Sequence, residues 1–258
     1  MTATVEIGKS HTARPAMNVP PMPREHGAWG ILLIPFATAV GVNGVFNLKV
    51  ALLLASVLSF YMARTSYLKR NLKWTAILSF GSIVCTAPLL IRWHLWWLTI
   101  FGAIAATLAF RKTERNVSMQ LLAVCGLTLT APAAWYTATG HLDVPAFLLW
   151  LLNVIYFAGG VLYVKMHVAA AIRRGSSKIR LGGPVLIYYT LSVCVLLALV
   201  GSSVISYWVL AAYAPVVARA FVGVGRLGPT LRIKRLGWTE VAYSLMYAVV
   251  LVGAFRFG

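Results

Sequence analysis

Acidic side chains are scarce in this sequence. Its 258 residues include five Asp and Glu against 23 Lys and Arg, and the single aspartate is Asp143. A protein site for Mg²⁺ is usually built on carboxylates, and no segment of this chain gathers several of them. The same scarcity disfavours a transporter that moves protons through a relay of buried acids. The sequence therefore predicts no metal and no other cofactor.

Cysteine is rare as well. The three cysteines, Cys85, Cys125 and Cys194, all lie inside apolar segments, and no two of them form a CxxC pair. An odd number of scattered cysteines excludes a disulfide framework and a cysteine-based metal site. We expect them to behave as small apolar side chains.

Charged residues of either sign are too few for a soluble domain. They make up 11% of the chain, against about 25% in ordinary soluble domains. Hydrophobic residues make up 60%, and the mean hydropathy is +0.81. A surface in contact with lipid explains this composition. The net charge of +18 then indicates basic loops beside anionic lipid head groups, and we expect no nucleic-acid partner.

Long apolar runs alternate with short polar segments along most of the chain. A helix needs about 20 apolar residues to cross the hydrocarbon core. This criterion predicts an all-α, polytopic membrane protein of about nine transmembrane helices. The predicted spans are roughly 28–46, 50–68, 74–91, 95–111, 117–138, 144–166, 183–201, 204–222 and 240–257.

Basic residues give the orientation, because Lys and Arg collect in cytoplasmic loops. With nine spans, all Lys and Arg fall on one side except Lys49, Arg92 and Arg256. The N-terminus is therefore predicted in the cytoplasm and the C-terminus outside, in the cytoplasmic (inner) membrane of a bacterium. Residues 1–23 are predicted to form a flexible, proline-rich cytoplasmic tail, and residues 24–258 a single transmembrane domain.

The first polar group near a span lies at residues 24–29. Arg24, Glu25 and His26 precede an apolar run that starts near Trp29. Glu25 would interact favourably with the positive end of the helix, and tryptophan favours the membrane interface. The segment is therefore either an interfacial anchor or a ligand contact. A lone Glu–His pair is too small a set of ligands for zinc.

The sixth predicted span carries a polar stripe along one helix face. Asn153, Tyr156, Gly160 and Tyr163 follow one another at spacings of three, four and three, and Lys165 lies near the inner end. The stripe could contact a ligand, or it could allow close helix packing beside small residues.

Opposite charges lie at the inner ends of the last two spans. Arg219 and Glu240 could form an ion pair that ties these helices together. Alternatively, Arg219 together with Arg226 could hold an anion, because arginine suits phosphate and carboxylate groups. For Arg219 we expect the second role.

Prolines occur inside several predicted spans. A proline inside a membrane helix frees a backbone carbonyl, which is tolerated only against protein or a wet cavity. These prolines are Pro35, Pro88, Pro132 and Pro215.

The opening motif resembles the YwiC-like family of bacterial membrane proteins. It reads Pro-Arg-Glu-His-Gly-Ala-Trp-Gly at residues 23–30, before a span that contains Pro35-Phe36. The stretches 115–134, 151–165 and 235–240 are also similar to that family. The resemblance covers most of the chain after residue 22, and it implies no particular activity.

The architecture is also similar to the UbiA superfamily of intramembrane prenyltransferases. The order of Arg111, Gln120 and Pro132 looks like the fourth-to-fifth helix region there. That family holds Mg²⁺ and a prenyl diphosphate with aspartate-rich motifs after its second and sixth helices. Here the corresponding segments, 64–70 and 163–167, contain no acidic residue. Arg64 and Lys165 stand there instead, and they could hold an anionic group without a metal.

The leading hypothesis is a cytoplasm-facing, basic cavity that binds an anionic or amphipathic ligand of lipid or isoprenoid type. Membrane lipid is the expected partner, and the sequence leaves open whether the protein also has a protein partner in a membrane complex. The chain is not predicted to be a conventional Mg²⁺-dependent prenyltransferase, and an enzymatic role is not favoured. The alternatives are a small-anion transporter, a metal-independent UbiA-like transferase with Glu25 or Glu240 as base, and a structural subunit. The ligand-binding candidates are Arg24, Glu25, His26, Trp29, Arg64, Gln120, Asn153, Tyr156, Tyr163, Lys165, Arg219 and Glu240.

Overall fold

A computed structural model describes residues 26–110, 116–172, 177–227 and 233–258. Within these residues the chain forms ten α-helices and no strand, as predicted for the fold class. The predicted tail at residues 1–23 lies outside the described residues. The helices are α1 (His26–Asn43), α2 (Leu48–Leu68), α3 (Leu72–Ile91), α4 (Trp97–Phe110), α5 (Val117–Leu127), α6 (Thr130–Thr139), α7 (Val144–Ile172), α8 (Lys178–Gly201), α9 (Trp208–Gly225) and α10 (Ile233–Phe257).

Asparagine begins three of these helices. The side chains of Asn47 and Asn71 accept hydrogen bonds from the backbone N–H groups of Val50 and Trp74, at 3.1 and 3.3 Å. Asn116 caps α5 in the same way, at 3.4 Å from Ser118 N. Each cap satisfies an N–H group that has no partner within its helix. These three residues therefore fix where α2, α3 and α5 begin.

Seven segments are long and apolar enough to cross a membrane. They are α2, α3, α7, α8, α9, most of α10, and the α5–α6 segment taken as one (Val117–Thr139). The other two predicted spans correspond to α1 and α4, whose apolar segments Gly27–Asn43 and Trp97–Leu108 are shorter than this criterion requires. A multi-pass membrane protein is thus supported, and seven of the nine predicted spans meet the length criterion in the described residues.

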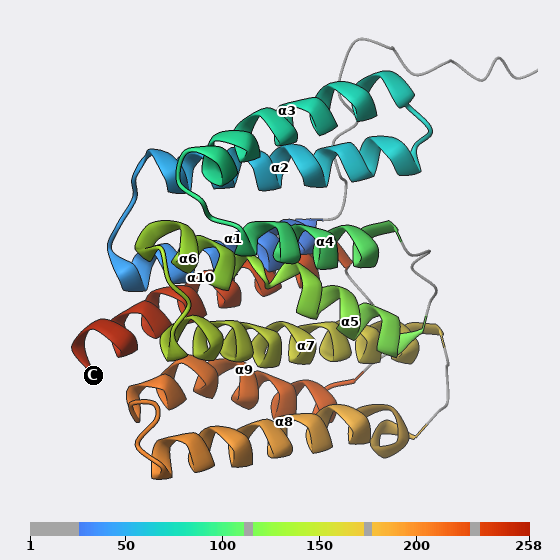
Figure 1. Ribbon diagram of the computed structural model, residues 1–258. Coiled ribbons are helices and arrows are strands. Elements are labelled where there is room, and N and C mark those ends of the chain that lie inside the picture. The colour runs from blue at the N-terminus through green and yellow to red at the C-terminus, as the bar shows by residue number, and fades with distance from the viewer. Residues whose placement is uncertain (1–25, 111–115, 173–176, 228–232) are drawn as a thin grey trace, which may run out of the picture.

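The helices run back and forth between two ends of the molecule (Figure 1). One end holds the start of α1, the turn from α2 to α3, the start of α8 and the end of α9. The other end holds the turns 44–47, 92–96, 140–143 and 202–207 together with the C-terminus. We call these the Arg64 end and the C-terminal end, because Arg64 lies in the last turns of α2.

The helices form a bundle and a hairpin. In the bundle, α1 packs against α6 and α10, and α7 to α10 pack in succession. The hairpin is α2 and α3, and the strongest packing of α3 is against α2 (Figure 1). Along α3 only Leu89 is buried, so most of this helix faces outward.

Glycines allow tyrosines to enter the contacts between α7, α8 and α9. A Cβ atom on Gly159 would lie 2.8 Å from the hydroxyl of Tyr189, and one on Gly223 would lie 2.6 Å from that of Tyr163. Any larger residue would displace these rings. Small residues at such contacts let membrane helices approach closely, so this half of the bundle is tightly packed.

Candidate functional site

The segment predicted as one span at residues 117–138 is broken into α5 and α6 at residues 128–129. Pro132 has no N–H group to donate to Thr128, which helps to explain the break. Hydroxyl groups satisfy two carbonyls at the break, because Thr128 donates to Cys125 O at 3.1 Å and Thr130 donates to Leu127 O at 3.2 Å. Thr130 also donates to Leu32 O on α1, at 2.9 Å. The indole N–H of Trp150 donates to Cys125 O at 3.2 Å. The break is therefore stabilised by α1 and α7.

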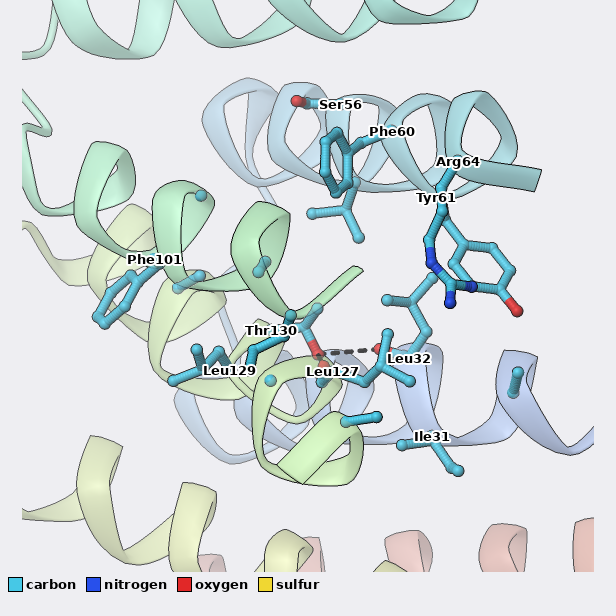
Figure 2. A pocket seen from close by; sticks show the side chains of 18 of the residues that line it. Ile31, Leu32, Ser56, Phe60, Tyr61, Arg64, Phe101, Leu127, Leu129 and Thr130 are labelled. Carbon is cyan, nitrogen blue, oxygen red and sulfur yellow. Dashed lines mark hydrogen bonds between the residues drawn. The ribbon is translucent and has the colours of Figure 1, made fainter. Parts of the chain in front are cut away.

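This broken helix forms one wall of a cavity of about 590 Å³. The hairpin α2–α3 forms the opposite wall, and α1 and α4 contribute the sides (Figure 2). Most of the lining side chains are apolar, including Phe60 and Phe101. A cavity of this size, with mostly apolar walls and a few polar groups, is the usual form of a small-ligand site.

The polar groups of the cavity lie at two levels. Arg64 and Gln120 lie toward the Arg64 end, and Figure 2 shows the Arg64 side chain extending from α2 toward α1. Ser56, Ser82 and Thr86 form a hydroxyl cluster further along α2 and α3. The hydroxyl of Ser56 lies 3.0 Å from that of Ser82 and 2.6 Å from that of Thr86. This cluster joins the two helices of the hairpin where they face the cavity.

The described part of the motif, residues 26–30, lies beside the cavity. Ala28 lines it, and the ring of Trp29 packs edge-on against that of Tyr61, another lining residue, with centroids 5.2 Å apart. Arg24 and Glu25 lie outside the described residues, as does the side chain of His26, although His26 begins α1. The ligand contact predicted for this motif stays a prediction.

Arg219 and Glu240 form a bidentate ion pair between α9 and α10. Arg219 Nη1 lies 2.6 Å from Glu240 Oε1, and Nη2 lies 3.1 Å from Oε2. The rings of Tyr163 and Tyr243 flank the guanidinium, with their centroids 4.3 and 4.5 Å from Cζ. Neither charged side chain lines the cavity. The geometry favours the clamp over the anion-binding role that we expected for Arg219.

Tyr156 belongs to an aromatic cluster next to this ion pair. Its ring stacks on that of Tyr247 at 3.8 Å and meets that of Tyr213 edge-on at 6.2 Å. The hydroxyl of Tyr213 donates to Leu152 O at 2.6 Å. Tyr156 and Tyr163, predicted on one face of a span, thus face the same group of helices, α9 and α10.

Asn153 joins α7 to α1. Its amide, which is fully buried, donates to Thr38 Oγ1 at 3.1 Å and to Leu149 O at 2.8 Å. The hydroxyl of Thr38 in turn donates to Pro35 O at 2.8 Å. Asn153 therefore stabilises α1 beside its internal proline and lies outside the cavity.

The structure thus divides the predicted site. Of the described candidates, Arg64 and Gln120 line the cavity, and Trp29 contacts its wall. Lys165 is half-buried on α7 and does not line it. Arg64 is the one basic side chain among the described lining residues, so the expected wall of several Arg and Lys residues is wrong for this part of the chain.

Sequence reasoning missed the helix break and the hydroxyl cluster. Two threonines close to Pro132 were a signal for the break, because hydroxyl groups commonly satisfy carbonyls near an intramembrane proline. The hydroxyl cluster had a weaker signal, since Ser56, Ser82 and Thr86 are small residues in apolar runs and give no pattern along the chain.

Comparisons with known proteins support the resemblance of the opening motif. The family described as YwiC-like protein matches residues 22–135, which span α1 to most of α6. The uncharacterized protein YwiC of Bacillus subtilis (strain 168) is 26% identical over 244 residues, covering 89% of this chain and 96% of that relative. No solved structure matches, and the architectural similarity to the UbiA superfamily stays a prediction. The two sequence matches show that this chain is similar to the YwiC-like proteins.

Proposed function

We propose that this membrane protein binds one amphipathic molecule in the cavity between the α2–α3 hairpin and the broken helix α5–α6. The observation that carries the proposal is a largely apolar cavity of about 590 Å³ with Arg64 and Gln120 toward one end. An apolar body would contact the walls, and a polar or anionic head would lie beside these two side chains.

The walls suit an apolar body. Phe60 and Phe101 offer aromatic faces, and the small residues Gly102, Ala105 and Ala123 leave room in the lining. Burying apolar ligand surface contributes about 25 cal/mol per Å². A molecule that already lies in a bilayer gains less, because lipid tails are apolar too. The fit to these walls would then decide which molecule binds.

Arg64 suits an anionic head. A guanidinium carries five N–H donors in a planar fork, so it can contact a phosphate or carboxylate while it keeps a contact with the protein. The amide of Gln120 could donate a further hydrogen bond. No bound cation is needed for this recognition.

The orientation proposed here places nine helical segments across the membrane, with α1 and α4 as short spans. Described basic residues such as Lys69, Arg70 and Lys178 lie at the Arg64 end, whereas Lys49, Arg92 and Arg256 lie at the C-terminal end. The excess of positive charge assigns the Arg64 end to the cytoplasm. The head of the ligand would then lie at the level of the cytoplasmic leaflet.

A second candidate function is transport of a small anion. The observation that favours it is the break between α5 and α6 in the cavity wall, because many transporters form their sites from discontinuous helices. Uptake of radiolabelled phosphate or acetate into proteoliposomes would support this function. If no anion flux is measured and an amphiphile stays bound to the purified protein, the binding function would be favoured over transport.

Native mass spectrometry of the protein purified in mild detergent tests the main proposal. We expect a bound amphiphile on the wild type. Arg64→Gln should lower its occupancy about tenfold or more, since a hydrogen bond to a charged group contributes about 1.5–3 kcal/mol. Arg226→Gln, at an exposed arginine outside the cavity, is the matched control.

A second variant tests the place of binding. Ala105→Phe would fill the space between α4 and the hairpin, and it should remove the bound mass without lowering the melting temperature. An amphiphile that stays bound equally to wild type, Arg64→Gln and Ala105→Phe would contradict the proposal.

A further inference from the structure

The cavity is closed toward the C-terminal end. Leu53 on α2 and Leu98 on α4 line it there, with exposed fractions of 5% and 6%. Behind them, Val50 and Leu89 are fully buried and Leu95 is 4% exposed. These five side chains, which we call the apolar plug, come from α2, α3, α4 and the turn before α4. A chain that enters from the Arg64 end would stop at the plug.

The stretch of the cavity from Leu53 to Arg64 corresponds in length to one leaflet. Leu53 and Arg64 are eleven residues apart on α2, which is about 16 Å along a helix with a rise of 1.5 Å per residue. On α4, the lining residues run from Leu98 to Leu108 and cover about 15 Å. The hydrocarbon core of a bilayer is about 30 Å thick, so each leaflet contributes about 15 Å.

The cavity has the size of a site for one ligand. Its volume of about 590 Å³ lies within the range of pockets for single small ligands. On α4, Gly102 lines the cavity, is exposed and has no side chain to block the space beside the helix. A chain lying in the membrane could therefore pass beside α4 without crossing the polar ends of the bundle.

We propose that the cavity measures the length of one hydrocarbon chain: it takes a single-chain anionic amphiphile, with the head at Arg64 and the chain end against the apolar plug. This inference rests on the proposed function and adds the ligand class and a determinant of specificity. Leu98 and Leu53 set the longest chain accepted, and Arg64 selects the negative head.

A series of n-alkyl phosphates, from octyl to octadecyl phosphate, tests the proposal. Each is added to delipidated protein, and its binding is measured by native mass spectrometry and by thermal shift. The wild type should show an optimum at one chain length. Leu98→Ala deepens the cavity and should move the optimum to longer chains. Leu196→Ala removes a buried leucine of α8 outside the cavity and should leave the optimum unchanged.

Gly102→Phe is a second variant that tests chain measurement if Leu98→Ala does not fold. A side chain at Gly102 would meet no atom within 4 Å of its Cβ, so the variant should be tolerated. Its ring should shorten the preferred chain. Alkyltrimethylammonium ions with the same chain lengths test the selection of the head group, and they should bind at least tenfold more weakly than the alkyl phosphates. Inorganic phosphate tests the head group without a chain, and it should not compete with the alkyl phosphates for binding.

The outcomes separate this inference from the proposed function. If alkyl phosphates bind and Arg64→Gln weakens them, but the optimum is the same in wild type, Leu98→Ala and Gly102→Phe, chain measurement is wrong and the proposed function stands. If no alkyl phosphate binds the wild type at any length, both are wrong. Equal binding of the ammonium series would overturn selection of an anionic head.

Discussion

At the scale of single residues, Arg219 shows how the bundle accommodates a charge. The side chains of Arg219 and Glu240 have exposed fractions of 10% and 19%. A charge taken out of water is costly unless it is paired and hydrogen-bonded. Here the carboxylate accepts two hydrogen bonds from the guanidinium, and two tyrosine rings flank the guanidinium. Arginine suits this place better than lysine because of its planar, bidentate geometry.

The ion pair predicts a specific pattern of stabilities. Arg219→Ala should lower the free energy of unfolding by about 3–5 kcal/mol, because Glu240 is left partly buried without its partner. The double variant Arg219→Met with Glu240→Leu should recover much of that loss, since neither charge then remains. Melting temperatures of the single and double variants in detergent measure this pattern.

Arg226→Ala, at an exposed arginine seven residues further along the chain, should change the melting temperature little. If Arg219 holds an anion instead, Arg219→Ala should fold almost normally and lose a bound ligand, and the double variant should regain nothing.

At the scale of elements, the break between α5 and α6 connects the cavity to the bundle. A broken helix in a membrane exposes carbonyls that lipid cannot satisfy. Thr128, Thr130 and Trp150 donate hydrogen bonds to Cys125 O and Leu127 O at the break. The bond from Thr130 to Leu32 O also fixes α6 against α1, on which the YwiC-like motif lies. The position of the cavity wall thus depends on a contact between helices far apart in the sequence.

Two threonines of α6 form a matched pair that tests whether the contact with α1 stabilises the protein. Thr130 and Thr137 are both buried, but Thr137 donates only to Ala133 O within its own helix. Thr130→Val should therefore reduce stability by about 1 kcal/mol more than Thr137→Val, because it alone removes a bond between helices. Equal melting temperatures for the two variants would show that the contact with α1 contributes nothing.

At the scale of the whole molecule, the tightly packed helices α7–α10 contrast with the hairpin α2–α3. Glycine–tyrosine contacts and the ion pair hold α7–α10 together. The hairpin is tied internally by Ser56, Ser82 and Thr86, and its outer helix exposes most of its side chains. The cavity lies between the hairpin and the broken helix α5–α6, which packs against α7. Small shifts of the hairpin would therefore change the width of the cavity.

The proposed orientation gives a prediction for the whole chain. A phosphatase that is active only after export should be active when fused after Gly258 and inactive when inserted after Lys178. The reason is the excess of Lys and Arg at the Arg64 end of the helices. A fluorescent protein that folds only in the cytoplasm should give the opposite result at each site. Cytoplasmic signals at both positions would contradict a chain that crosses the membrane an odd number of times.

The sequence by itself determined the all-helical membrane fold, the positions of the helical segments and the similarity to the YwiC-like proteins. Long apolar runs must form helices in lipid, because every backbone polar group needs a partner there. The scarcity of acids also made Glu240 the natural partner for Arg219, although the sequence left anion binding open.

Only the tertiary structure decided where the cavity lies, which candidates line it and where the fifth predicted span breaks. In a soluble helix, the apolar face points to the core. In a membrane helix, lipid and core are equally apolar, so the pattern of residues does not show which face is buried. Arg64 and Gln120 line the same cavity, and Asn153 bonds to Thr38, because of packing between helices that the sequence alone does not pair.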